Sequence, residues 1–191
     1  NGTGIVNLNS GNISNNTTSS SGTVCINNGQ LNINGGSIYS NSASSGGAVR
    51  LINDTTSSNI KISELNCNGG YLYNNSANNG GAINASDMCI VNLYESEIYN
   101  NEANKGKALY AYSNSIIKTY ADTHIDDSNE IWLNGSTIEI IEEPKKDTVA
   151  SIGFSSTTDG KVVGKILYSE SALASSIIDK FTVIPSISKE I

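Results

Sequence analysis

The chain has 191 residues and a formal net charge of −7, with 18 Asp and Glu against 11 Lys and Arg. This acidic balance argues against nucleic-acid binding, which needs a basic surface, and no apolar run is long enough for this segment to insert into a membrane as a helix. Asn (27), Ser (29) and Gly (18) dominate the composition. Aliphatic residues nevertheless recur and Pro is nearly absent, so this polarity does not indicate a disordered linker.

An imperfect repeat occupies most of the N-terminal part of the chain. The clearest copies are GGSIYSNSASSGGAV (35–49), GGYLYNNSANNGGAI (69–83) and ESEIYNNEANKGKAL (95–109), and a weaker copy precedes them at 11–24. Their matching aliphatic residues are spaced by 25, 34 and 26 positions, and these are Ile13, Ile38, Leu72 and Ile98. The longer spacing indicates an insertion of eight or nine residues around 52–60.

Each copy contains three short stretches in which every second residue is apolar, as at 31–33, 37–39 and 48–52. This alternation is the period of a strand with one buried face, and the Asn-Gly and Gly-Gly pairs between the stretches favour turns. Three strands and three turns in about 25 residues predict one coil of a solenoid. We therefore expect an all-β, right-handed parallel β-helix over residues 1–140.

Coils stacked about 4.8 Å apart place equivalent residues directly above one another. We expect three interior stacks: Leu31, Leu65 and Val91; Ile33, Cys67 and Leu93; and Val24, Val49, Ile83 and Leu109. In this arrangement Cys67 fills an aliphatic position in the core.

Four asparagines fall in register three residues after the stacked aliphatic residue, and they are Asn16, Asn41, Asn75 and Asn101. An Asn that turns inward at a corner can bond its own coil and the next one, so a hydrogen-bonded Asn ladder is predicted. The alternative is coincidence in an Asn-rich chain.

Tyr39, Tyr73 and Tyr99 are also in register and lie next to inward residues, so they should point outward. They form either stacking cover or an exposed binding stripe.

The composition changes near residue 134, after which no Asn occurs. We place a boundary at 134–148 and expect residues 141–191 to form a small β-rich cap or appendage. Strand-like runs occur at 148–154, 161–168 and 180–184, with a turn at 157–160 and a possible short helix near 170–179.

Motifs for catalysis, metals or cofactors are not found, so none of these sites is expected. Paired carboxylates could cleave a sugar, and among the candidates Glu95 and Glu97 would share one face. The full set is Glu64, Asp87, Glu95, Glu97, Glu102, Asp122, Asp126, Asp127 and Glu130. Without a cluster of cations beside them they are more typical of a solvated surface. His124, the single histidine, has Asp neighbours that suit either a cation site or a polar turn.

The repeat resembles that of the polymorphic outer membrane proteins, whose signatures are GGAI and FxxN. GGAI occurs at 80–83, with GGAV at 46–49 and GKAL at 106–109 as variants. The FxxN position reads IYSN (38–41), LYNN (72–75) and IYNN (98–101), so Ile or Leu replaces Phe. The resemblance covers about residues 10–112 and implies an adhesin-like β-helix that is secreted or on the cell surface.

The sequence is compatible with two functions of different classes. The first is a non-catalytic extracellular structural or adhesin-like segment, which could assemble end to end into a surface filament and could meet a host or cell-surface ligand. Residues 1–49 contain no Asp, Glu, Lys, Arg or His, so the first coil could pack against a copy of itself or a neighbouring domain of the same parent protein. The alternative is a β-helix that binds or cleaves carbohydrate.

Overall fold

The computed structural model describes residues 4–54, 56, 61–142, 145, 150–154, 164–168 and 181–184. Within these residues the chain forms β-strands and no helix, and the strands build three parallel sheets. The predicted all-β parallel β-helix is confirmed. No helix in this part of the chain has the length and apolarity needed to cross a membrane.

The strands follow one another in coils of three. Coil one contains β1 (Ile5–Leu8), β2 (Asn12–Ser14) and β3 (Val24–Asn27); coil two contains β4 (Gln30–Ile33), β5 (Ser37–Tyr39) and β6 (Val49–Ile52). Coil three contains β7 (Glu64–Cys67), β8 (Tyr71–Tyr73) and β9 (Ile83–Ala85); coil four contains β10 (Ile90–Leu93), β11 (Glu97–Tyr99) and β12 (Leu109–Tyr112). Coil five contains β13 (Ile116–Thr119), β14 (His124–Ile125) and β15 (Glu130–Asn134). Coil six contributes β16 (Ser136–Ile140) and β17 (Ala150–Phe154), and coil seven contributes β18 (Gly164–Tyr168) and β19 (Phe181–Ile184).

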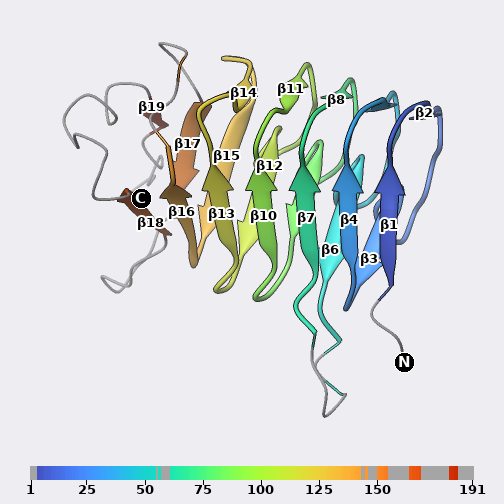
Figure 1. The fold of residues 1–191 in the computed structure, drawn as a ribbon, viewed down its shortest axis with the longest axis horizontal. Helices are drawn as coiled ribbons and strands as arrows, with labels where there is room; N and C mark the ends of the chain where they lie inside the picture. The colour runs from blue at the N-terminus through green and yellow to red at the C-terminus, as the bar shows by residue number, and fades with distance from the viewer. Residues whose placement is uncertain are drawn as a thin grey trace, which may run out of the picture.

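The winding of the coils is right-handed. In Figure 1 the strands β1, β4, β7, β10, β13 and β16 run upward at the front, the chain crosses the top, and it returns behind through the sheet that contains β3 and β6. The coils advance from right to left in this view. A path that rises in front and descends behind while advancing leftward is a right-handed helix, as sequence analysis predicted.

Residues one coil apart pair in register throughout the sheets. In the first seven-stranded sheet Leu31 pairs with Leu65 and Leu65 with Val91. The other two predicted stacks, through Cys67 and through Ile83, are also observed. The five-stranded sheet stacks the repeat's aliphatic residues, Ile13, Ile38, Leu72 and Ile98, and extends them to Ile125. The core is therefore a bundle of aliphatic columns that runs the length of the solenoid.

The first glycine of each GGAI-like motif makes a corner that other residues cannot adopt easily. Gly46, Gly80 and Gly106 have φ values of +68°, +69° and +66°. A Cβ on Gly80 would lie 2.2 Å from the carbonyl oxygen of Ile83 in the same coil. The turn therefore needs both the left-handed conformation and the absence of a side chain, which explains why this glycine recurs.

The predicted insertion lies between β6 and β7. Gln30 pairs with Glu64, 34 residues later, whereas Ile5 pairs with Gln30 after 25 residues. Register is kept on both sides of the inserted residues, and the two described ends of the insertion meet where the backbone N–H of Ser63 donates to Asn53 Oδ1 at 2.7 Å.

The strands after residue 140 add to the same sheets. β17 pairs with β15 and β19, and β18 pairs with β16, all in parallel. The runs at 148–154 and 161–168 therefore join different sheets and do not form a hairpin with each other. The turn at 157–160 and the possible helix near 170–179 lie outside the described residues, so the cap over residues 141–191 stays a prediction.

Candidate functional site

The outer face of the five-stranded sheet carries the predicted tyrosine column. The rings of Tyr39 and Tyr73 are stacked with centroids 4.8 Å apart and planes within 2°, and Tyr73 and Tyr99 are 5.0 Å apart within 4°. Partial burial, with smaller contributions from neighbouring tyrosines and Glu97, raises the pKa of Tyr99. The stack itself is confirmed, and all three rings are partly exposed. Its use as a binding stripe stays a proposal.

A second outward column runs parallel to the tyrosine stack, two residues earlier in each strand. Its members pair in register and are Asn12, Ser37, Tyr71, Glu97 and His124. Small polar residues in the first two coils give way to an aromatic ring, a carboxylate and an imidazole in the later coils. The chemistry of this face is therefore concentrated in coils three to five.

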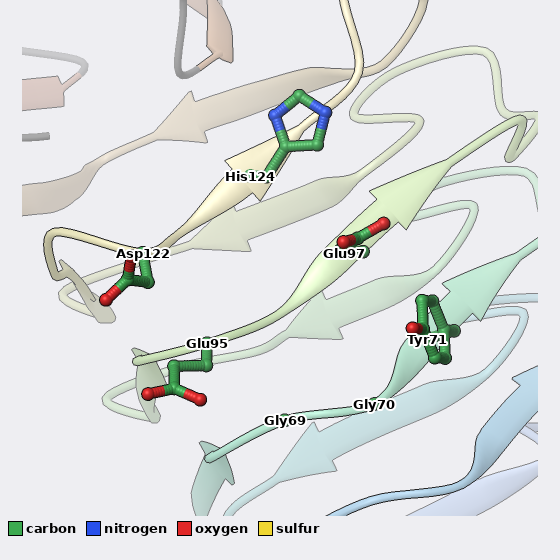
Figure 2. A pocket seen from close by; sticks show the side chains of 7 residues that line it. All are labelled: Gly69, Gly70, Tyr71, Glu95, Glu97, Asp122 and His124. Atoms are coloured by element: carbon green, nitrogen blue, oxygen red, sulfur yellow. The ribbon is translucent and has the colours of Figure 1, made fainter. Parts of the chain in front are cut away.

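A hollow of about 500 Å³ opens on this part of the surface. It is lined by Gly69, Gly70, Tyr71, Glu95, Glu97, Asp122 and His124 (Figure 2). The two glycines keep its floor free of side chains, while Tyr71 is 45% exposed and presents an aromatic ring at one side. Figure 2 shows the carboxylates and the imidazole contributed by successive coils.

The three carboxylates of the hollow differ in their partners. Asp122 accepts a hydrogen bond from Lys145 Nζ at 2.7 Å, and this bond raises the pKa of the lysine. Among the described residues, Glu95 and Glu97 have no ion-pair partner. The hollow is thus a net acidic, open surface whose two free carboxylates can accept hydrogen bonds from hydroxyl or ammonium groups.

His124 lies in β14, and Asp126 begins the turn that follows this strand. The backbone N–H of His124 donates to the carbonyl of Ser96 at 3.0 Å, while its Nδ1 is buried without a hydrogen-bond partner. The Ser128 hydroxyl and amide both donate to Asp126 Oδ1 and lower the pKa of that carboxyl group. Asp126 is therefore part of a turn. In the described part of the chain, no three His, Cys, Asp or Glu side chains are grouped so that they could hold a metal ion.

The remaining candidate carboxylates do not line this hollow. Glu64 Oε1 accepts from Asn92 Nδ2 at 2.9 Å on the first sheet, and Glu102 lines a second hollow of about 390 Å³ together with Lys107. The others are Asp87, Asp127 and Glu130. Glu95, Glu97 and Asp122, all among the candidate carboxylates, line the hollow together with His124, whereas sequence analysis did not include Tyr71 at this site. In-register alignment of all outward positions, applied beyond the tyrosines, would have found Tyr71.

The predicted Asn ladder is present and buried at one corner of the coil. Each rung joins two asparagines, because one side-chain oxygen accepts both the backbone N–H and the side-chain Nδ2–H of the Asn in the preceding coil. Asn41 donates to Asn75 Oδ1 at 3.2 and 3.0 Å, and Asn75 donates to Asn101 Oδ1 at 2.9 and 3.1 Å. Asn129, which the sequence comparison did not include, forms a further rung below Asn101.

The residue before each of the four predicted ladder asparagines explains the recurring Asn-Asn and Ser-Asn pairs. Asn15, Ser40, Asn74 and Asn100 all have positive φ, between 51° and 58°. Asn tolerates this conformation better than most side chains. The left-handed residue turns the chain so that the following Asn points into the coil.

Two shallower Asn ladders on the outer face of the first sheet were not predicted. Side-chain amides link Asn7, Asn32, Asn66 and Asn92 in one row, and Asn9, Asn34 and Asn68 in the other. Their donor–acceptor distances range from 2.7 to 2.9 Å. Asparagine therefore connects adjacent coils both at the inward corner and along these outward rows, in which Asn7 and Asn9 are exposed whereas Asn66 and Asn92 are buried.

The three cysteines are unpaired, and two of them are buried. Burial raises the pKa of Cys67 and of Cys89 to about 12, so neither thiol has appreciable thiolate at neutral pH. Cys67 occupies the aliphatic position predicted for it. Cys25 is exposed in β3 of the first coil.

The first coil is open on its outer side. Each of β1, β2 and β3 has one neighbouring strand, and no described segment folds over their other edges (Figure 1). Val6 is 50% exposed, although its register partner Leu31 in coil two is only 2% exposed. The aliphatic columns of the core thus end in a half-exposed surface at this face.

Comparisons with protein-family models, with curated proteins and with solved structures find no match to this chain.

Proposed function

We propose that this chain is a non-catalytic, structural segment of an extracellular, adhesin-like β-helix. Its role would be to form a rigid polar rod and to join that rod to further coils. The resemblance of its GGAI and LYNN motifs to the polymorphic outer membrane protein repeat agrees with this proposal. In this chain those motifs form the glycine corner and the Asn rung.

Rigidity is the property that the repeat supplies. From coil one to coil five, each coil is tied to the next by three parallel strand pairs and by a buried Asn rung, and the described strands of coils five to seven add two parallel pairs at each step. The aligned tyrosines and outer asparagines add side-chain contacts between coils on the surface. A fold whose contacts run only between neighbouring coils lengthens without changing its cross-section.

The open face of coil one is the observation that carries the proposal. Free edges on three parallel strands present unpaired N–H and C=O groups to any neighbour, and such edges favour strand addition. Val6, the end of an interior column, exposes apolar surface there, and residues 1–49 add no Asp, Glu, Lys, Arg or His. A neutral, partly apolar edge with free backbone groups is suited to assembly.

Sedimentation velocity over a range of protein concentrations tests this role. We expect the unmodified chain to associate reversibly, with little dependence on salt because the first coil is uncharged. Val6→Lys places a charge on the open face and should leave the chain monomeric. The matched control is Ile62→Lys, since Ile62 is 44% exposed but belongs to the connection before β7. A monomeric parent chain, or equal association of both variants, would contradict the assembly role.

The hollow beside Tyr71 favours a second candidate, a carbohydrate-binding or carbohydrate-cleaving β-helix. An exposed ring next to two unpaired carboxylates offers a sugar one stacking surface and several hydrogen-bond acceptors. Glycosidases place two carboxyl groups on either side of the bond they cleave.

A glycan array and a reducing-end release assay separate the two candidates. Glycan binding that Tyr71→Ala abolishes and Tyr112→Ala leaves intact would favour the carbohydrate role, because Tyr112 has the same 45% exposure on another strand. Release of reducing ends that Glu97→Gln abolishes would establish cleavage. Neither signal is expected for the structural segment.

A further inference from the structure

We propose that the open face of coil one docks a further coil of this same repeat, one that carries an Asn at the corner and an Asn-x-Asn pair at the end of its first strand, with the second Asn just after it. This inference rests on the proposed assembly function and names the partner of that face. Three asparagines of the first coil, Asn7, Asn9 and Asn16, carry it.

The buried ladder has a direction, and its N-terminal side is incomplete. Asn41 Oδ1 accepts the backbone N–H and the Nδ2–H of Asn16, both at 3.0 Å, and the same pattern repeats down the ladder. Asn16 Oδ1 is the next acceptor in this series, and no described residue donates to it. The incoming coil must therefore supply a backbone N–H and a side-chain amide at this corner.

The opposite side of the ladder is closed by the chain itself. The backbone N–H of Asn129 donates to the carbonyl of Asp126 at 2.8 Å, and its Nδ2 donates to Ser128 Oγ at 2.9 Å. Asn129 Oδ1 already accepts from Asn101. The ladder thus ends in coil five and remains open only at coil one.

The outer ladders present the complementary groups at the same face. In these rows the side-chain amide donates toward the N-terminal coil, as Asn32 Nδ2 does to Asn7 Oδ1 at 2.7 Å and Asn34 Nδ2 does to Asn9 Oδ1 at 2.8 Å. The Nδ2 groups of Asn7 and Asn9 therefore have no acceptor among the described residues. One acceptor at the corner and two donors on the first sheet define which coil fits.

Coils two and three have all three asparagines at these positions, namely Asn32, Asn34 and Asn41, and Asn66, Asn68 and Asn75. The C-terminal strands of another copy cannot supply them, because no Asn follows residue 134. Head-to-tail stacking of identical chains would leave the three groups without partners. The occupant that fits is an Asn-bearing repeat coil in the same chain direction.

The test adds such a coil and measures hydrogen exchange. A duplicate of residues 62–87, the complete third coil, is joined ahead of residue 3 of the full chain. We expect the amides of β1 and β2 to exchange at least about tenfold more slowly than in the parent chain, and the exchange of coils three and four to remain unchanged as an internal control.

Two variants of the added coil test the role of asparagine. In the added copy, Asn75→Asp removes the Nδ2 donor and places a carboxylate against Asn16 Oδ1, so the protection should be lost. Asn78→Asp in the added copy is the matched control, because Asn78 is exposed in the same turn region, and its protection should match that of the unmodified fusion.

The outcomes separate this inference from the proposed function. Equal protection by all three fusions would overturn the asparagine requirement and leave the assembly face standing. Absence of protection in every fusion would overturn both. Reversible association of the unfused chain should protect β1 and β2 less than the fused coil does, because the C-terminal strands of a second copy bring no Asn to this face. If the unfused chain at high concentration gains protection equal to that of the fusion, a second copy fits the face as well as an Asn-bearing coil and the inference is wrong. A stable added coil is checked independently by the exchange of its own amides.

Discussion

Removal of the central rung of the buried ladder gives the sharpest test of what holds the coils together. Asn75 is fully buried. Its Oδ1 accepts the backbone N–H and Nδ2–H of Asn41, and its Nδ2 donates to Asn101 Oδ1 and to the carbonyl of Ile38 at 2.9 Å. Asn75→Ala deletes all of these bonds at once, while the backbone N–H of residue 75 keeps its acceptor on Asn101.

The magnitude follows from the groups left without partners. The backbone N–H of Asn41 and the carbonyl of Ile38 each lose the Asn75 side chain, and Asn41 Nδ2 keeps only its bond to the carbonyl of Ile13. A buried polar group without a partner costs about 1–3 kcal/mol. Because water can enter part of the vacated space, we expect the free energy of unfolding to fall by about 3–5 kcal/mol.

Urea unfolding followed by circular dichroism measures this loss, with equal m-values required for the comparison. Asn16→Ala should cost no more than about 1 kcal/mol, because Asn16 is exposed and water replaces its bonds. Asn78→Ala, on the surface, should change stability by less than about 0.5 kcal/mol. If Asn75→Ala costs no more than Asn16→Ala, buried amide pairing does not hold the corner and the reasoning fails.

Three further predictions concern other columns of the solenoid. Gly80→Ala should destabilise the chain by about 1–3 kcal/mol, because Gly80 has a φ of +69° and an added Cβ would meet a backbone carbonyl. The control is Gly69→Ala, which should be tolerated because its Cβ would make only an ordinary 3.4 Å contact. Thermal unfolding compares the two variants, and equal melting temperatures would contradict the steric argument. Tyr73→Ala removes two stacked contacts and Tyr39→Ala removes one. The Tyr73 variant should therefore lose more stability, since each stacked contact contributes about 0.5–1.5 kcal/mol beyond burial. An equal loss of stability in the two variants would mean that stacking contributes little. A thiol-specific reagent at pH 8 should modify Cys25 alone in the folded chain, since burial raises the pKa of the other two thiols to about 12; modification of more than one thiol before unfolding would contradict their burial.

The repeat could be predicted from the sequence because every coil needs the same types of residue at equivalent positions. Ile38 and Leu72 occupy one interior column, so selection for an aliphatic residue recurs at a fixed spacing. Gly80 recurs as Gly46 and Gly106 because only glycine suits the corner. The residue type at each of these positions is determined by contacts within one coil, and the pattern is therefore visible in the amino-acid sequence.

The Asn129 rung shows where prediction from the repeat pattern fails. Asn129 follows Asn101 by 28 residues and lies in a segment that lacks the IYxN pattern, so alignment did not include it. Its place was decided by the turn at Asp126, which accepts hydrogen bonds from Ser128 and shortens the middle strand. Turn length changes from coil to coil, and register after a changed turn depends on how the whole coil closes.

Sequence by itself therefore determined the solenoid: its strand period, its interior columns, the buried Asn ladder and the outward tyrosines. Tertiary structure alone decided which outward side chains meet. Glu95 and Asp122 belong to different coils, and they line one hollow with Tyr71 because parallel pairing brings equivalent corners together. The physical reason is the range of the interactions: strand alternation and corner sterics act within a coil, whereas surface grouping and the unpaired amides of coil one depend on how neighbouring coils stack.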